Sequence, residues 1–197
     1  MSNDDYIVSF QPGAVPDKIF HYVYGNELDG AIHYVSNAEV AAGCLKTGKN
    51  SADDNVKVDY VVLAEPAVTK VVSSTEGRTK YANLQELYKE KSGGLPIFQA
   101  SLFVQNNLDK NEVNIFLIKL KNDIEAALET PMLLSQALNN NPSSEAIYMV
   151  KPDIATTVTL NNNGMGLGFA LARENKDAID LFLSLFGIGE TSEEIYF

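Results

Sequence analysis

A run of β-favouring residues that passes directly into a helical pattern constrains the fold of this chain more than any other feature. Val58 and the residues from Tyr60 to Leu63 favour a buried strand, and four apolar residues between Ala67 and Val72 then recur at helical spacing. Pro66 stands between the two patterns and suits a helix start, where its missing N–H has no partner to lose. We therefore expect a strand, inside a sheet rather than at its edge, that leads straight into a helix.

The same order of elements occurs twice earlier in the chain. Residues 6–10 form a predicted strand that ends at the turn 11–14, and a helix is expected from Val15 to about Tyr24. A second strand is expected over 31–35, followed by a helix to about Lys46 that closes near Gly48. Three strand–helix units in series predict an α/β fold with a parallel sheet and right-handed crossovers.

The second half of the chain has a different pattern. Residues 97–104 are predicted to be a fourth strand, antiparallel beside the others, and 155–160 a possible last strand. A long helix should begin at Asp109, and its apolar stripe from Val113 to Leu128 should face a core. An amphipathic helix is expected over 177–186. We therefore predict an α/β ligand-binding lobe over 1–104. The mainly helical segment 105–197 either packs on that lobe or forms part of a second one.

Composition and motifs exclude several classes of function. The net charge of −11, with 15 scattered Lys and Arg residues, argues against a nucleic-acid partner, and no apolar run is long enough to span a membrane. The single cysteine, Cys44, excludes a disulfide framework, and His21 and His33 lack the spacing of metal ligands. The glycines at 164, 166 and 168 have the wrong spacing for a dinucleotide site. Without a nucleophile motif either, we expect no enzyme activity, no cofactor and no metal.

Polar residues and tight turns follow each of the three parallel strands. Ligands of open α/β sheets bind beyond the carboxyl ends of the strands, where helix N-termini offer free N–H groups to an acceptor or an anion. A carboxylate at Glu65 would attract an amine or another donor. The alternative is that Ser36, in a capping box with Glu39, and Glu65 only cap their own helices. The predicted ligand-binding residues are Gln11, Gly13, Ala14, Ser36, Asn37, Glu65 and Gln99.

Three segments in this order resemble the second lobe of ABC-transporter substrate-binding proteins. They are 9–17 (SFQPGAVPD), 41–48 (AAGCLKTG) and 58–70 (VDYVVLAEPAVTK), and the leucine-alanine-glutamate-proline stretch at 63–66 is the most specific marker. The resemblance continues through 84–88, 95–104 and 195–197. The nearest group binds sulfonates, taurine, nitrate and thiamine-pyrimidine precursors. The family's closing glycine-lysine-leucine-proline segment is replaced here by 187–192 (GIGETS).

The resemblance implies a periplasmic-binding-protein-like lobe that binds a small-molecule ligand without turnover and delivers it to an ABC permease. It also implies an extracellular or periplasmic location and a lipoprotein-type membrane anchor in the full-length form. The signal and the first lobe segment expected of the family do not precede residue 1. A ligand-sensing or regulatory module of the same fold is the alternative, and neighbouring genes would discriminate the two.

Overall fold

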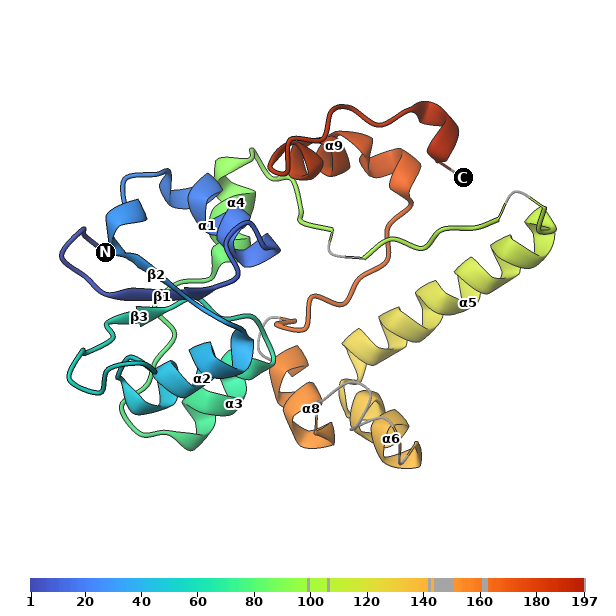
Figure 1. Cartoon of the computed structure of the whole chain (residues 1–197). Helices are drawn as coiled ribbons and strands as arrows, with labels where there is room; N and C mark the ends of the chain where they lie inside the picture. The colour runs from blue at the N-terminus through green and yellow to red at the C-terminus, as the bar shows by residue number, and fades with distance from the viewer. Residues whose placement is uncertain (99, 106, 142, 144–150, 161–162, 197) are drawn as a thin grey trace. The chain divides into compact units, whose positions relative to one another are not determined.

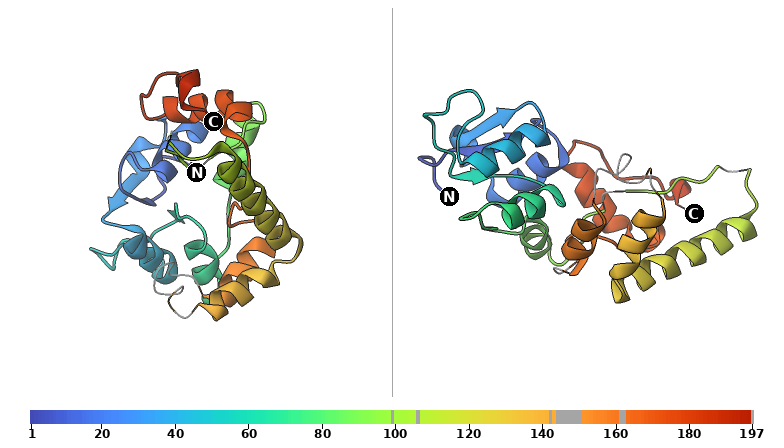
Figure 2. Two further views of the ribbon diagram at one scale, coloured as in Figure 1. Left: turned by 90° about the vertical axis from the view of Figure 1, so that its right-hand side faces the viewer. Right: turned by 90° about the horizontal axis from the view of Figure 1, so that it is seen from below.

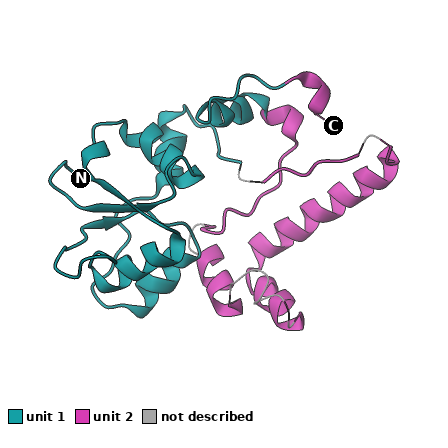
Figure 3. Cartoon of the chain, viewed as in Figure 1, with its two compact units in different colours: residues 1–99, 176–191 teal, residues 100–175, 192–197 magenta. Residues whose placement is uncertain are grey.

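The computed structural model describes residues 1–98, 100–105, 107–141, 143, 151–160 and 163–196. The chain divides into two compact units (Figure 3). Unit 1 comprises residues 1–99 and 176–191, and unit 2 comprises residues 100–175 and 192–197. Unit 1 thus takes in a segment from the helical half of the sequence. Each unit is described by itself below.

A three-stranded parallel sheet forms the centre of unit 1 (Figure 1). Its strands are β1 (Ile7–Phe10), β2 (Ile32–Val35) and β3 (Tyr60–Val61), in the order β2-β1-β3. Ile7 is in register with the first residue of both neighbours. The predicted α/β class and the parallel direction of the three strands are confirmed.

The expectation that the strand within 58–63 lies inside the sheet is wrong, because β3 is an edge strand and β1 is central. Three consecutive residues of β1, Ile7 to Ser9, are buried, whereas only Val58 and Val62 are buried in the segment around β3. The central strand is covered on both faces and flanked on both sides. The apolar residues in 58–63 did not indicate that β1, and not β3, is the central strand.

A helix follows each strand of the sheet. These helices are α1 (Val15–Tyr24), α2 (Ala38–Thr47) and α3 (Ala67–Ser74), and a fourth helix, α4 (Leu84–Lys91), comes later in the chain. A short 3-10 helix, Asp29–Ala31, precedes β2. α1 packs with α4, while α2 packs with α3 on the other side of the sheet (Figures 1 and 2). Helices on both faces are what a parallel sheet requires.

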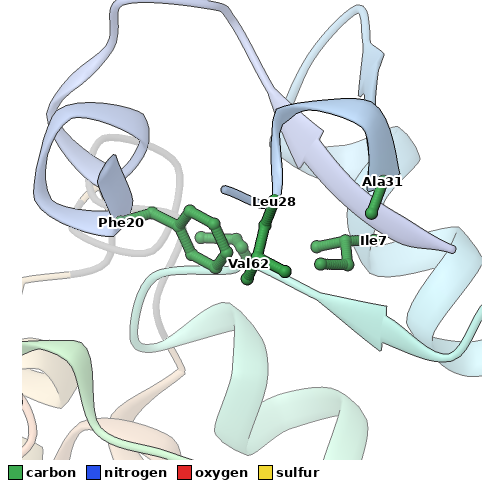
Figure 4. Close-up of a cluster of buried hydrophobic side chains, with 5 residues drawn as sticks. All are labelled: Ile7, Phe20, Leu28, Ala31 and Val62. Carbon is green, nitrogen blue, oxygen red and sulfur yellow. The ribbon is translucent and has the colours of Figure 1, made fainter. Parts of the chain in front are cut away.

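The hydrophobic core of unit 1 follows the alternation of side chains along β1. Ile7 points into a cluster with Phe20, Leu28, Ala31 and Val62 on the α1 side (Figure 4). The next residue, Val8, points to the α2 side. Its partners there are Ala41, Cys44 and Val58. A third cluster joins α1, α4 and α9 (Lys176–Ser184) through Ile19, Tyr88, Ile97 and Phe182.

The predicted fourth strand over 97–104 is wrong for the residues that the structure describes there. Ile97 is buried in the third cluster, and Leu102 and Phe103 are 60% and 84% exposed, outside any strand. An apolar segment becomes a strand only when its backbone can hydrogen-bond to a neighbouring strand. The sequence pattern of a segment does not show whether such a neighbour is present.

The elements that the structure describes in unit 2 are all helices, and residues 100–105 and 163–171 lie outside them. Unit 2 contains α5 (Lys110–Glu129), α6 (Met132–Asn140) and α8 (Pro152–Leu160), with 3-10 helices at Ala172–Asn175 and Glu193–Ile195. α5 is one unbroken helix in every view (Figures 1 and 2). The predicted strand at 155–160 is wrong, because Ala155, Val158 and Thr159 are the buried face of α8.

α5 begins as predicted but does not bury its apolar stripe. The Asp109 carboxylate accepts hydrogen bonds from the N–H groups of Asn111 and Glu112, at 2.8 and 3.1 Å, as an N-cap should. Within the helix only Val113 and Ala127 are buried, and Phe116 is 51% exposed. The expectation that the whole stripe faces a core is therefore wrong.

Candidate functional site

The loops that follow the three strands lie at one edge of the unit 1 sheet, because parallel strands share the same direction. Residues 11–14 follow β1, residues 36–37 follow β2, and Glu65 comes four residues after β3. The structure thus brings six of the seven predicted site residues to this edge. Gln99 lies outside the described residues.

The loop between β1 and α1 is held by a buried carboxylate. Gln11 and Gly13 have φ of 49° and 79°, and the Gly13 N–H donates to Asp17 Oδ2 at 2.7 Å. Ala14 provides no side-chain cap for α1, and Pro16 in the first turn has no N–H. The N-cap residue of α1 therefore makes no side-chain hydrogen bond to the first turn of the helix.

Asp17 also links this loop to β2. The Tyr34 hydroxyl donates to Asp17 Oδ1 at 2.7 Å. Partial burial, strengthened by this hydrogen bond and by the Asp17 and Asp29 charges, raises the pKa of Tyr34 to about 12. His21 lies alongside, with Nδ1 2.8 Å from the Asp17 carbonyl and Nε2 3.1 Å from Asp29 Oδ1. Tyr34 therefore stays a neutral donor at ordinary pH.

The start of α2 corrects the predicted capping box. Asn37, not Ser36, is the N-cap, and its Oδ1 accepts from the Val40 N–H at 3.0 Å. Asparagine is as good an N-cap as serine, so one residue of shift costs the helix nothing. The predicted helix end is confirmed, since Gly48 closes α2 with φ of 72°. Ser36 is an exposed residue at the sheet edge.

The Glu65 carboxylate has partners within unit 1. It accepts from the Thr69 N–H at 3.1 Å and from the Thr69 hydroxyl at 2.9 Å, and it forms an ion pair with Lys80. Lys80 Nζ also lies 3.0 Å from Thr69 Oγ1. These contacts fasten the first turn of α3, as the capping alternative requires.

A recess of about 510 Å³ begins at this edge and runs along β2. Its lining includes Tyr34 and Ser36 from β2 and the residue after it, and also Tyr6, His33 and Asn50. The rings of Tyr6 and His33 stack with centroids 3.7 Å apart and planes 2° apart. The Asn50 amide donates to the Tyr6 hydroxyl. Of the six predicted site residues that the structure describes, Ser36 alone lines the recess.

The residues that sequence reasoning missed come together through the fold. Asp17 could have been found, because an acidic residue in the first turn of a helix is a recognised signal. Tyr6 and His33 stack because the β1–β2 register places them diagonally on the same face. No local pattern marks Asn50, which reaches Tyr6 from 44 positions away.

Among the described residues, no three His, Cys, Asp or Glu side chains lie close enough together to hold a metal ion. Nor is any of the described helices both long and apolar enough to cross a bilayer. Comparisons of the chain with protein-family models, with curated proteins and with solved structures found no match.

Proposed function

We propose that this chain is the solute-binding component of an ABC-type importer. It binds a small polar or charged metabolite without transforming it and, on the outer side of the membrane, delivers it to a permease. The resemblance of segments 9–17, 41–48 and 58–70 supports this role, and all three lie in the parallel α/β unit. The observation that carries the proposal is the recess that begins at the carboxyl edge of that unit's sheet.

The lining of the recess suits a flat, polar ligand. Its volume of about 510 Å³ falls within the range of small-molecule sites, which is roughly 300–1,000 Å³. The stacked Tyr6 and His33 rings provide an aromatic surface. Ser36 and Asn50 add a hydroxyl and an amide, each able to donate and to accept. A polar heterocycle carrying both donors and acceptors fits this set.

The charges at the edge favour a neutral or cationic ligand over an anionic one. Asp17 lies in the first turn of α1 and offsets the positive end of that helix. Asp29 is close by, bonded to His21. The positive field of an uncapped helix N-terminus is therefore largely cancelled. Gln11, which is exposed in the same loop, can add a neutral hydrogen bond.

A binding screen followed by two substitutions tests this proposal. Compounds that bind the folded chain raise its melting temperature, so a thermal-shift panel of polar heterocycles, amino acids, sulfonates and nitrate should identify a ligand. Replacing exposed His33 by Ala and Ser36 by Val should then weaken binding about tenfold or more in calorimetry. Glu76→Gln, an exposed change outside the recess, serves as the matched control.

The same samples test the absence of turnover. The bound compound should be recovered chemically unchanged after long incubation with the protein. Conversion of the compound would contradict a binding role, and equal affinities in the His33, Ser36 and Glu76 variants would remove the recess from the site. A permease and an ATPase encoded beside this gene would support transport over sensing.

A further inference from the structure

A small basic pocket lies in unit 1 just before the first residue of β3. This is the amino-terminal end of the strand, opposite the loops described above. The pocket has a volume of about 270 Å³, where the end of α2 meets the segment that leads into β3. Its charged lining residues are Lys49, Lys57 and Arg78, with Asp54 as the single acid. The whole chain has 15 basic and 26 acidic residues. The lining of this pocket is therefore positively charged although the chain as a whole is negatively charged.

Arg78 is held in place with part of its hydrogen-bonding capacity unused. Its Nη2 donates to the Lys46 carbonyl at 3.5 Å, at the end of α2. A Cβ on Gly48 would lie 2.5 Å from Nη2, so the glycine lets the guanidinium pack directly against the backbone. Among the described residues, Arg78 Nε has no hydrogen-bond partner although it is buried. The hydroxyl of Thr75, in the same turn, is also buried and unpartnered.

Buried donors without partners are rare in folded proteins and point to a missing acceptor. The Nε edge of a guanidinium presents two parallel N–H groups that match the oxygens of a phosphate or sulfate. Lys49 and Lys57 add positive charge around the same space, although Lys57 also holds Asp59 at 2.6 Å. An anion in this pocket would balance the local positive charge, and the Arg78 guanidinium would have to turn its Nε edge, which is buried in this structure, toward the bound oxygens.

We propose that this pocket binds a tetrahedral oxyanion, a phosphate or sulfate group, through Arg78 with Lys49 in support. The site is separate from the recess beside β2 and does not depend on the function proposed above. The group can come from a soluble anion or from a lipid headgroup, since both present the same oxygens. Asp54 faces the same space and opposes the bound charge.

Calorimetry with inorganic phosphate on the full chain tests this inference. We expect saturable binding that Arg78→Met weakens about tenfold or more, because hydrogen bonds to a charged group are lost. Arg78→Lys should also weaken binding, since the charge remains but the paired N–H groups do not. Asp54→Asn should strengthen it. Lys70→Met, an exposed change of the same charge outside the pocket, should leave it unaltered.

Folding controls, variants that leave Arg78 in place and a vesicle assay complete the test. Circular dichroism and melting without phosphate show whether Arg78→Met folds, and Lys49→Met and Asp54→Asn test the pocket without touching Arg78. Co-sedimentation with phosphatidylglycerol–phosphatidylcholine vesicles identifies the source of the group. Retention that Arg78→Met abolishes assigns a lipid headgroup, and phosphate binding without retention assigns a soluble anion. Absence of both kinds of binding, or equal behaviour of the Arg78→Met and Lys70→Met variants, overturns the proposal.

Discussion

Replacing Glu65 by Gln should destabilise unit 1, because the carboxylate fastens the start of α3. The substitution keeps the shape of the side chain and removes its charge. The Glu65 side chain is 17% exposed and accepts two hydrogen bonds from Thr69. The amide retains one acceptor, so one of these bonds is lost, at a cost of about 1 kcal/mol. The ion pair with Lys80, which is 44% exposed, adds at most about 1 kcal/mol.

The expected loss is therefore about 1–2 kcal/mol. Urea unfolding followed by far-ultraviolet circular dichroism measures it, and with a slope of about 1–3 kcal/mol per molar the midpoint should fall by on the order of 1 M. Glu76→Gln makes the same charge change at an exposed position and should alter stability by less than about 0.5 kcal/mol.

A double-mutant cycle with Thr69→Val should give a coupling energy of about 0.5 kcal/mol or more, since the two side chains are bonded directly. Equal stabilities of the Glu65 and Glu76 variants would show that the Glu65 carboxylate does not stabilise the start of α3. Such a result, accompanied by weakened ligand binding in Glu65→Gln, would return Glu65 to the ligand site.

Three other perturbations test the structure at separate places. Tyr34→Phe should remove a tyrosinate signal that appears near pH 12 in an alkaline absorbance titration, because partial burial and Asp17 raise that pKa. Hydrogen bonds from Lys176 and Thr191 lower the pKa of Asp180 to about 2. The stability they contribute is therefore present above about pH 4 and lost as the pH falls toward 2, and melting curves of Asp180→Asn should lack that part of the acid dependence. Ile7→Ala in the central strand should cost about 2–5 kcal/mol in chemical unfolding, whereas an unchanged midpoint would contradict its place in the core.

Elements with strong local signals were predictable from the sequence. The start of α1 follows from the turn at 11–14, and Gly48 marks the end of α2. Asp109 identifies the start of α5. Each of these signals depends only on a few neighbouring residues, and each of them marks a helix start or end in the structure.

Features that depend on distant partners were not predictable. The position of β3 at the sheet edge is set by which strands pair, and the apolar run at 58–63 carries no such information. Short apolar runs such as 155–160 are ambiguous between strand and helix. The recess depends on Tyr6, His33 and Asn50, which meet only after the sheet and its loops have formed.

An amide-resolved NMR titration of the intact chain with a compound from the ligand screen shows whether the carboxyl edge of the sheet and the recess beside β2 bind the solute. We predict shifts at the amides of Gln11, Gly13 and Ala14, of residues 33–36 and of Asn50, with the compound unchanged at the end of the experiment. Glu76 and its neighbours should not shift. Shifts confined to residues away from the carboxyl edge of the sheet and the recess beside β2, or chemical conversion of the compound, would contradict the account.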